Sequence, residues 1–205
     1  MGTLRASSQM ISYELAMGLS LVALIMTTST LSVSEIVEQQ DLGYCNFVYQ
    51  PFGFLIFIIC AFAETNRAPF DLPETESELV GGYHTEFSSM KLGFYLFSEY
   101  INMFISSAIM ASLYFGGFHF PFENELMPSL GEGWVRVLGF ILFMGKIIGF
   151  IFLFMWIRWT VPRFRYDQLM NLGWKTLLPL SILNLVVTGI VVAVKEGWFN
   201  VLFEK

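Results

Sequence analysis

Long apolar runs alternate with short polar segments along this chain of 205 residues. A helix needs roughly 20 predominantly apolar residues to cross the hydrocarbon core of a bilayer. The pattern therefore predicts an all-α fold, a polytopic transmembrane helix bundle in a single membrane domain that covers residues 1–205. Five spans are predicted, of which the second is close to the shortest length that crosses: residues 11–31, 47–63, 92–115, 134–157 and 176–194.

The composition supports a membrane protein and excludes several other classes. Hydrophobic residues make up 55% of the chain and charged residues 14%, and the mean hydropathy is +0.62. The net charge of −6 argues against a nucleic-acid-binding protein, which needs a basic surface for phosphates. Cys45 and Cys60 lack the spacing of a metal or redox motif, and His84 and His119 are isolated, so no metal site is predicted.

The cations predict how the chain is oriented. In the five-span arrangement seven of them fall on one side, and only Lys195 and Lys205 fall clearly on the other. Cytoplasmic loops of membrane proteins carry an excess of Lys and Arg. The loops 64–91 and 158–175 are therefore expected to be cytoplasmic, as is the start of the chain, and its end is expected to be periplasmic. The seven cations are Arg5, Arg67, Lys91, Arg158, Arg163, Arg165 and Lys175.

The segment 64–86, between the second and third spans, is acidic and contains one cation, Arg67. A solvated loop is the ordinary interpretation of a charge run. A solvated loop does not explain why one stretch of seven residues combines these types: Arg67, Pro69, Phe70, Asp71 and Pro73. We therefore favour the alternative that this segment has a function. Seven carboxylates belong to this region if the next span is included: Glu64, Asp71, Glu74, Glu76, Glu78, Glu86 and Glu99.

A short helix is predicted inside this segment. Asp71 can cap its start, Pro73 is tolerated in its first turn, and Glu74 completes a capping box. Residues 81–82 are both glycine and end the helix. Glu74 and Glu78 would then share one face and Glu76 would point away, so at least two surfaces need partners.

Four ionisable residues lie at or inside predicted spans: Glu14, Glu64, Glu99 and Lys146. A charge at the centre of a spanning helix costs about 2.5–3.5 kcal/mol on insertion scales, so such residues face wet cavities or one another. For Glu14 and Glu64 the alternatives are an interfacial position or a proton relay. For Glu99 and Lys146 they are an ion pair between spans or the same relay.

Four motifs resemble those of one protein family, in the expected order and over nearly the whole chain. That family is the H-type membrane subunit of proton-translocating NADH–quinone oxidoreductase, respiratory complex I. Its pattern has eight spans, and this chain resembles the last five, so we expect a fragment or a misplaced start. The motifs are Leu4-Arg-Ala-Ser-Ser-Gln-Met-Ile-Ser-Tyr-Glu14, Glu64-Thr-Asn-Arg-Ala-Pro-Phe-Asp-Leu-Pro-Glu74, Glu99-Tyr-Ile-Asn102 and Trp156-Ile-Arg-Trp-Thr-Val-Pro-Arg-Phe-Arg-Tyr-Asp-Gln-Leu-Met170.

The resemblance implies a membrane subunit of an enzyme that is not catalytic alone. This sequence has no NAD-binding glycine pattern, so the chain is not expected to oxidise NADH alone. The resemblance implies that the substrate is a quinone and that flavin and iron–sulfur clusters belong to partner subunits. The partners would be soluble quinone-site and iron–sulfur subunits and antiporter-like membrane subunits, in the cell inner membrane. The residues implied at the quinone chamber are Arg67, Phe70, Asp71, Glu74, Glu76 and Glu78, and those of the proton relay are Glu14, Glu64, Glu99 and Lys146.

Two other functions stay open at this point. One is the related membrane subunit of an energy-converting hydrogenase, against which the intact segment from Asn66 to Pro73 weighs. The other is a free-standing ion transporter. Internal repeats would support a transporter, but the first two predicted spans show no similarity to the last two.

Overall fold

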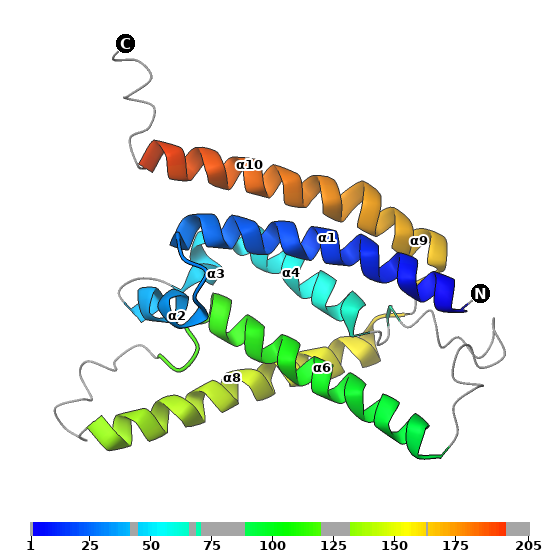
Figure 1. Cartoon of the computed structure of the whole chain (residues 1–205), viewed down its shortest axis with the longest axis horizontal. Helices are drawn as coiled ribbons and strands as arrows, with labels where there is room; N and C mark the ends of the chain where they lie inside the picture. Colours follow the sequence, from blue (N-terminus) through cyan, green and yellow to red (C-terminus); the bar gives the residue numbers. More distant parts are fainter. Residues whose placement is uncertain are drawn as a thin grey trace, which may run out of the picture.

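The computed structural model of the chain describes residues 2–41, 45–65, 69–70, 89–119, 132–162 and 164–195 (Figure 1). All the regular secondary structure in these ranges is helical, which confirms the predicted all-α class. Four stretches are long and apolar enough to cross a membrane, and a fifth apolar helix is shorter. The four are Ser7–Thr28, Met90–Tyr114, Gly133–Thr160 and Tyr166–Lys195.

The long helices run in alternating directions. We call the end of the bundle where α1 begins, α4 ends, α6 begins and α8 ends the loop end, and the opposite end the far end (Figure 1). The described helices are α1 (Gly2–Thr28), α2 (Val33–Asp41), α3 (Asn46–Tyr49), α4 (Pro51–Glu64), α6 (Met90–Tyr114), α8 (Glu132–Thr160), α9 (Tyr166–Asn171), the π-helix η2 (Leu172–Leu177) and α10 (Leu178–Lys195).

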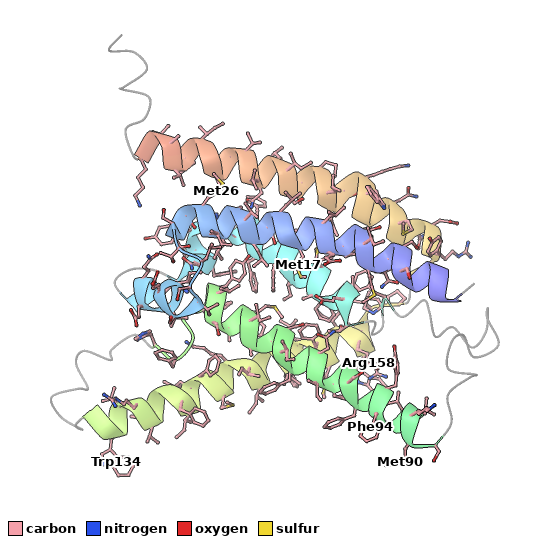
Figure 2. The ribbon with its side chains drawn as sticks, in the orientation of Figure 1. Met17, Met26, Met90, Phe94, Trp134 and Arg158 are labelled. Carbon is pink, nitrogen blue, oxygen red and sulfur yellow. The ribbon has the colours of Figure 1, made fainter. Side chains whose placement is uncertain are left out.

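Helix α1 lies between α4 and α10, and α6 crosses α8 (Figure 1). Small and aromatic side chains fill the contact of α1 with α4, where Tyr13 and Ala16 pack into one buried cluster with Ile56 and Cys60. Large apolar side chains cover the outer faces: Phe94 and Trp134 point away from the bundle and are 66% and 68% exposed (Figure 2). In water this would be unfavourable, whereas lipid or a neighbouring membrane helix suits such surfaces.

The second predicted span is divided in the structure. Residues 47–63 form two helical pieces, α3 and α4, because Gln50 leaves the helical region with φ −133° and ψ 65°. Pro51 explains the break, since the ring of a proline disfavours the α conformation in the residue before it. Pro51 then serves as the first residue of α4, a position where its missing N–H has no helical partner to lose.

The last predicted span begins earlier than residue 176. Helix α9 starts at Tyr166, inside the predicted loop 158–175, and continues through η2 into α10. Gln168 supports this start because its side-chain Oε1 accepts the N–H of Arg165 at 3.2 Å. The π-helix is explained by Pro179, which cannot donate a backbone hydrogen bond and whose ring would clash with the carbonyl four residues earlier.

The predicted polar segment 32–50 also contains a helix, α2. Its Ile36 and Val37 are buried, at 2% and 3% exposed, and the helix packs against α6 at the far end. Near the start of α8 at the same end, Arg136 adds a third cation to the two that the orientation argument placed there.

Candidate functional site

A buried glutamine at the loop end binds the chain at the end of α4 and again six residues beyond it. Gln9 of α1 is 0% exposed. Its Nε2 donates one hydrogen bond to the Ala63 carbonyl and another to the Phe70 carbonyl, each at 3.1 Å. Only six residues separate Ala63 from Phe70, so one amide fixes the chain on either side of Arg67.

Phe70 is sandwiched between two aromatic rings from distant parts of the chain. Its ring centroid lies 5.9 Å from that of Tyr13 in α1 and 5.6 Å from that of Phe164, which it meets in a stacked arrangement. The backbone N–H of Phe164 also donates to the Pro69 carbonyl at 3.2 Å. We call Gln9, Tyr13, Pro69, Phe70 and Phe164 the Phe70 clamp.

The clamp continues into the last helical segment. The hydroxyl of Tyr13 donates to the Leu169 carbonyl at 3.0 Å, and the Ser8 and Tyr166 hydroxyls share a hydrogen bond of 2.8 Å. Gly173 in η2 packs so closely that a Cβ there would lie 3.4 Å from Ser12 Cβ. Helix α1 therefore ties the start of the acidic loop to η2, and π-helical segments are often found at functional sites.

Three of the four sequence motifs thus meet at one end of the bundle. The sequence singled out Phe70, but it did not indicate Gln9 or Phe164 as its neighbours, nor Leu169 as the partner of Tyr13. The sequence contains only a weak indication of a role for Gln9. It is a polar side chain at the start of an apolar run, and it needs a hydrogen-bond partner if its helix packs against other helices and buries it. The remaining residues predicted for the quinone chamber lie outside the described residues, as does the predicted short helix: Arg67, Asp71, Glu74, Glu76 and Glu78.

The three carboxylates predicted for a relay occupy the half of the bundle at the loop end. Glu14 lies in the first half of α1, Glu64 is the last residue of α4, and Glu99 lies in the first half of α6. Their surroundings differ: Glu99 is 7% exposed, Glu64 is half-buried and Glu14 is exposed. Glu14 is close enough to Glu64 for the two carboxyl groups to interact electrostatically.

Lys146 has a different environment from these carboxylates. Its Nζ donates to the carbonyls of Phe115 and Gly117 at 2.7 Å and of His119 at 2.8 Å. Gly116 and Gly117 have φ of 70° and 53°, which turns the chain back after α6. An ammonium has three N–H donors, and here each has a carbonyl acceptor, at the end of a helix where positive charge is favourable.

The ion pair considered for Glu99 and Lys146 is therefore not formed. Phe115 follows Glu99 by 16 residues along α6, which corresponds to roughly 24 Å of helix at 1.5 Å per residue. Lys146 binds the far end of α6, whereas Glu99 lies toward the loop end.

Replacing Lys146 by methionine should destabilise the far end of the bundle. The change keeps most of the side-chain volume and removes the three N–H donors, and a hydrogen bond to a charged group contributes about 1.5–3 kcal/mol. We expect a clear drop in the midpoint of thermal unfolding of the purified protein. Lys175→Met, at an exposed lysine in η2, is the matched control. Equal midpoints for the two variants would contradict the capping role.

These features define a class of protein: an integral membrane protein in which the start of an acidic segment is fixed at one end of a helix bundle. The family model described as NADH dehydrogenase matches residues 1–189. The chain belongs to this family, which confirms the resemblance seen in the sequence motifs.

The chain is similar over almost all of its length to bacterial proteins named as the H-type subunit of NADH-quinone oxidoreductase. It is 65% identical over 189 residues to the first such protein of Cytophaga hutchinsonii, covering 92% of this chain and 55% of that one. The protein of Flavobacterium psychrophilum is 63% identical over 190 residues, or 93% and 55% of the two chains. One from Rhodothermus marinus, named subunit 8, is 50% identical over 201 residues, or 94% and 59%. The chain spans about half the length of these relatives.

Proposed function

We propose that this chain is the membrane subunit of an NADH–quinone oxidoreductase, where it forms the membrane-side part of the quinone chamber and couples quinone reduction to proton translocation. The names of the relatives support the assignment to this complex. The observation that carries the assignment of a site is the Phe70 clamp, because it fixes the start of the acidic loop against two other family motifs.

The clamp suits the chemistry of a quinone. A quinone offers an apolar ring and two carbonyl acceptors, so its chamber needs an aromatic or aliphatic wall and a few fixed donors. In this proposal Phe70 and its neighbours give the wall a fixed position. Arg67 follows the fixed Ala63 by four residues and supplies donors, while Asp71 and the glutamates beyond it set the charge of the chamber.

Quinone reduction consumes two electrons and two protons, and this chain would handle the protons. The electrons would come from iron–sulfur clusters in a soluble partner subunit, fed by flavin in another. Glu14, Glu64 and Glu99 all lie in the half of the bundle toward the loop end, which allows a lateral row of carboxylates that leads away from the chamber. Lys146 would act on this row as a fixed positive charge rather than as a proton carrier. Its three N–H donors already bind backbone carbonyls, which hold the ammonium in place beyond the end of the row that is farthest from the chamber.

The proposed placement follows from the same pattern. The chain would lie in the cell inner membrane with the loop end facing the cytoplasm, where soluble quinone-site and iron–sulfur subunits could dock on the acidic loop. Antiporter-like membrane subunits and lipid would cover the apolar outer faces. A hydrogenase membrane subunit and a free-standing transporter are less well supported, because the named relatives are NADH–quinone oxidoreductase subunits.

Arg67→Ala tests the site within this function. The variant should lower quinone-reductase activity by about tenfold or more, which corresponds to about 1.4 kcal/mol of lost transition-state stabilisation. NADH oxidation by a water-soluble artificial acceptor should survive, since it bypasses the quinone. Both rates are measured on the purified complex. A parallel loss of both activities would assign the effect to assembly and would contradict a role of Arg67 at the quinone.

A further inference from the structure

The break before α4 places irregular backbone deep in the membrane region. Helix α4 has 14 residues, or roughly 21 Å of length, whereas the hydrocarbon core is about 30 Å thick. A helix of this length that reaches one membrane surface with Glu64 leaves Gln50 inside the hydrocarbon region toward the far end. Non-helical backbone at such a depth occurs where it is buried in protein or beside water.

Two polar atoms at this break are buried without a hydrogen-bond partner. Gln50 is 5% exposed, and its Nε2 donates to the Ala23 carbonyl of α1 at 2.9 Å and lies 3.5 Å from Thr188 Oγ1 of α10. Its Oε1 has no donor. On α10, Asn184 Nδ2 is also buried and has no acceptor. A buried polar atom that stays unsatisfied destabilises the fold, so both atoms call for a hydrogen-bond partner.

Both atoms border the same small space above Gly53. A Cβ added to Gly53 would lie 3.1 Å from Gln50 Oε1 and 3.4 Å from Asn184 Nδ2. Because glycine has no Cβ, this space is not filled by α4 itself. An unsatisfied acceptor at the break and an unsatisfied donor on α10 therefore lie near one position.

The chemistry of these atoms selects the ligand. The occupant must donate to a carbonyl-type oxygen and accept from an amide N–H at the same time. A cation cannot accept a hydrogen bond from the amide N–H of Asn184, and an anion cannot donate one to the amide oxygen of Gln50. Water does both, and buried waters typically satisfy about three otherwise unpaired polar groups.

We propose that one ordered water molecule binds over Gly53, donates to Gln50 Oε1 and accepts from Asn184 Nδ2. The water joins α4 to α10 at the point where the Gln50 amide already holds α1 through Ala23. It completes the polar contacts of the broken helix, which no side chain in the described ranges completes. The site is separate from the Phe70 clamp, and it does not depend on the proposed function.

A cryo-electron microscopy map of the purified native complex that resolves ordered water tests this site. We expect a density peak within hydrogen-bonding distance of both Gln50 Oε1 and Asn184 Nδ2. Gly53→Ala should remove the peak, because the added methyl group occupies its place, and Asn184→Leu should remove it by deleting the donor. Gly18→Ala is the matched control, since a Cβ at Gly18 meets nothing within 4 Å, and it should keep the peak.

The wild-type map alone can overturn the proposal. If both side chains are resolved and either bond directly to each other or face an empty space, the water site is wrong. Persistence of the peak in Gly53→Ala would also contradict it, because the site as proposed leaves no room for both the methyl group and the water.

Discussion

Replacing Glu99 by glutamine is expected to remove most proton pumping from the assembled complex. Glu99 is 7% exposed within α6, and glutamine keeps its shape but cannot bind and release a proton. Buried ionisable groups interact strongly because the dielectric around them is low. A carboxylate row that loses this member should therefore no longer respond to quinone chemistry, and quinone reduction that is coupled to pumping should fall with it.

The measurement is proton uptake into vesicles that contain the reconstituted complex, with quinone-reductase activity followed in parallel. Glu38→Gln is the control, since Glu38 is an exposed carboxylate on α2 outside the long apolar helices, and it should pump normally. Normal pumping with full quinone-reductase activity in Glu99→Gln would reject Glu99 as a relay residue.

Truncating Phe70 to alanine is the second change with a large expected effect. Removal of a buried phenylalanine side chain typically costs about 3–5 kcal/mol, and here it deletes both ring contacts of the clamp, with Tyr13 and Phe164. We expect quinone-reductase activity to fall by about tenfold or more, equivalent to at least 1.4 kcal/mol. Among the described residues, the hydrogen bonds that Phe70 and Pro69 accept at their backbone carbonyls would then still hold the start of the acidic segment.

The comparison for this variant is Phe94→Ala, which shortens a ring that is 66% exposed on α6 (Figure 2). Native gel electrophoresis establishes that both variants assemble, and steady-state kinetics with quinone and with an artificial acceptor separate the site from the rest of the enzyme. If Phe70→Ala retained full quinone-reductase activity in an assembled complex, the clamp would have no role in the chamber.

The helices could be predicted well because bilayer thickness sets the length of an apolar run. Four of the five predicted spans correspond to helices long enough to cross. The break at Gln50 was visible in principle as Gln50-Pro51, but the hydropathy of the surrounding run outweighed it. The start of α9 was not predicted because charged residues such as Arg165 and Asp167 are typical of loops. In the structure they lie at the start of a helix that continues through η2.

The contacts of the site could not be predicted, for a physical reason. Gln9 and Phe70 are 61 residues apart, and Tyr13 and Leu169 are 156 apart. Local periodicity carries no information on which distant segments pack together. The partners of Lys146 are backbone carbonyls that Gly116 and Gly117 orient, and a search for an acidic partner side chain could not have found them.

We propose that the segment fixed by the Phe70 clamp lines the quinone chamber. Photolabelling of the purified complex with a light-activated quinone analogue would identify the residues that line it. We expect labelled peptides from this chain between residues 64 and 91, with labelling suppressed by excess quinone. If the labelling that excess quinone suppresses falls only on other subunits, or on this chain only at the far end, this segment does not line the chamber.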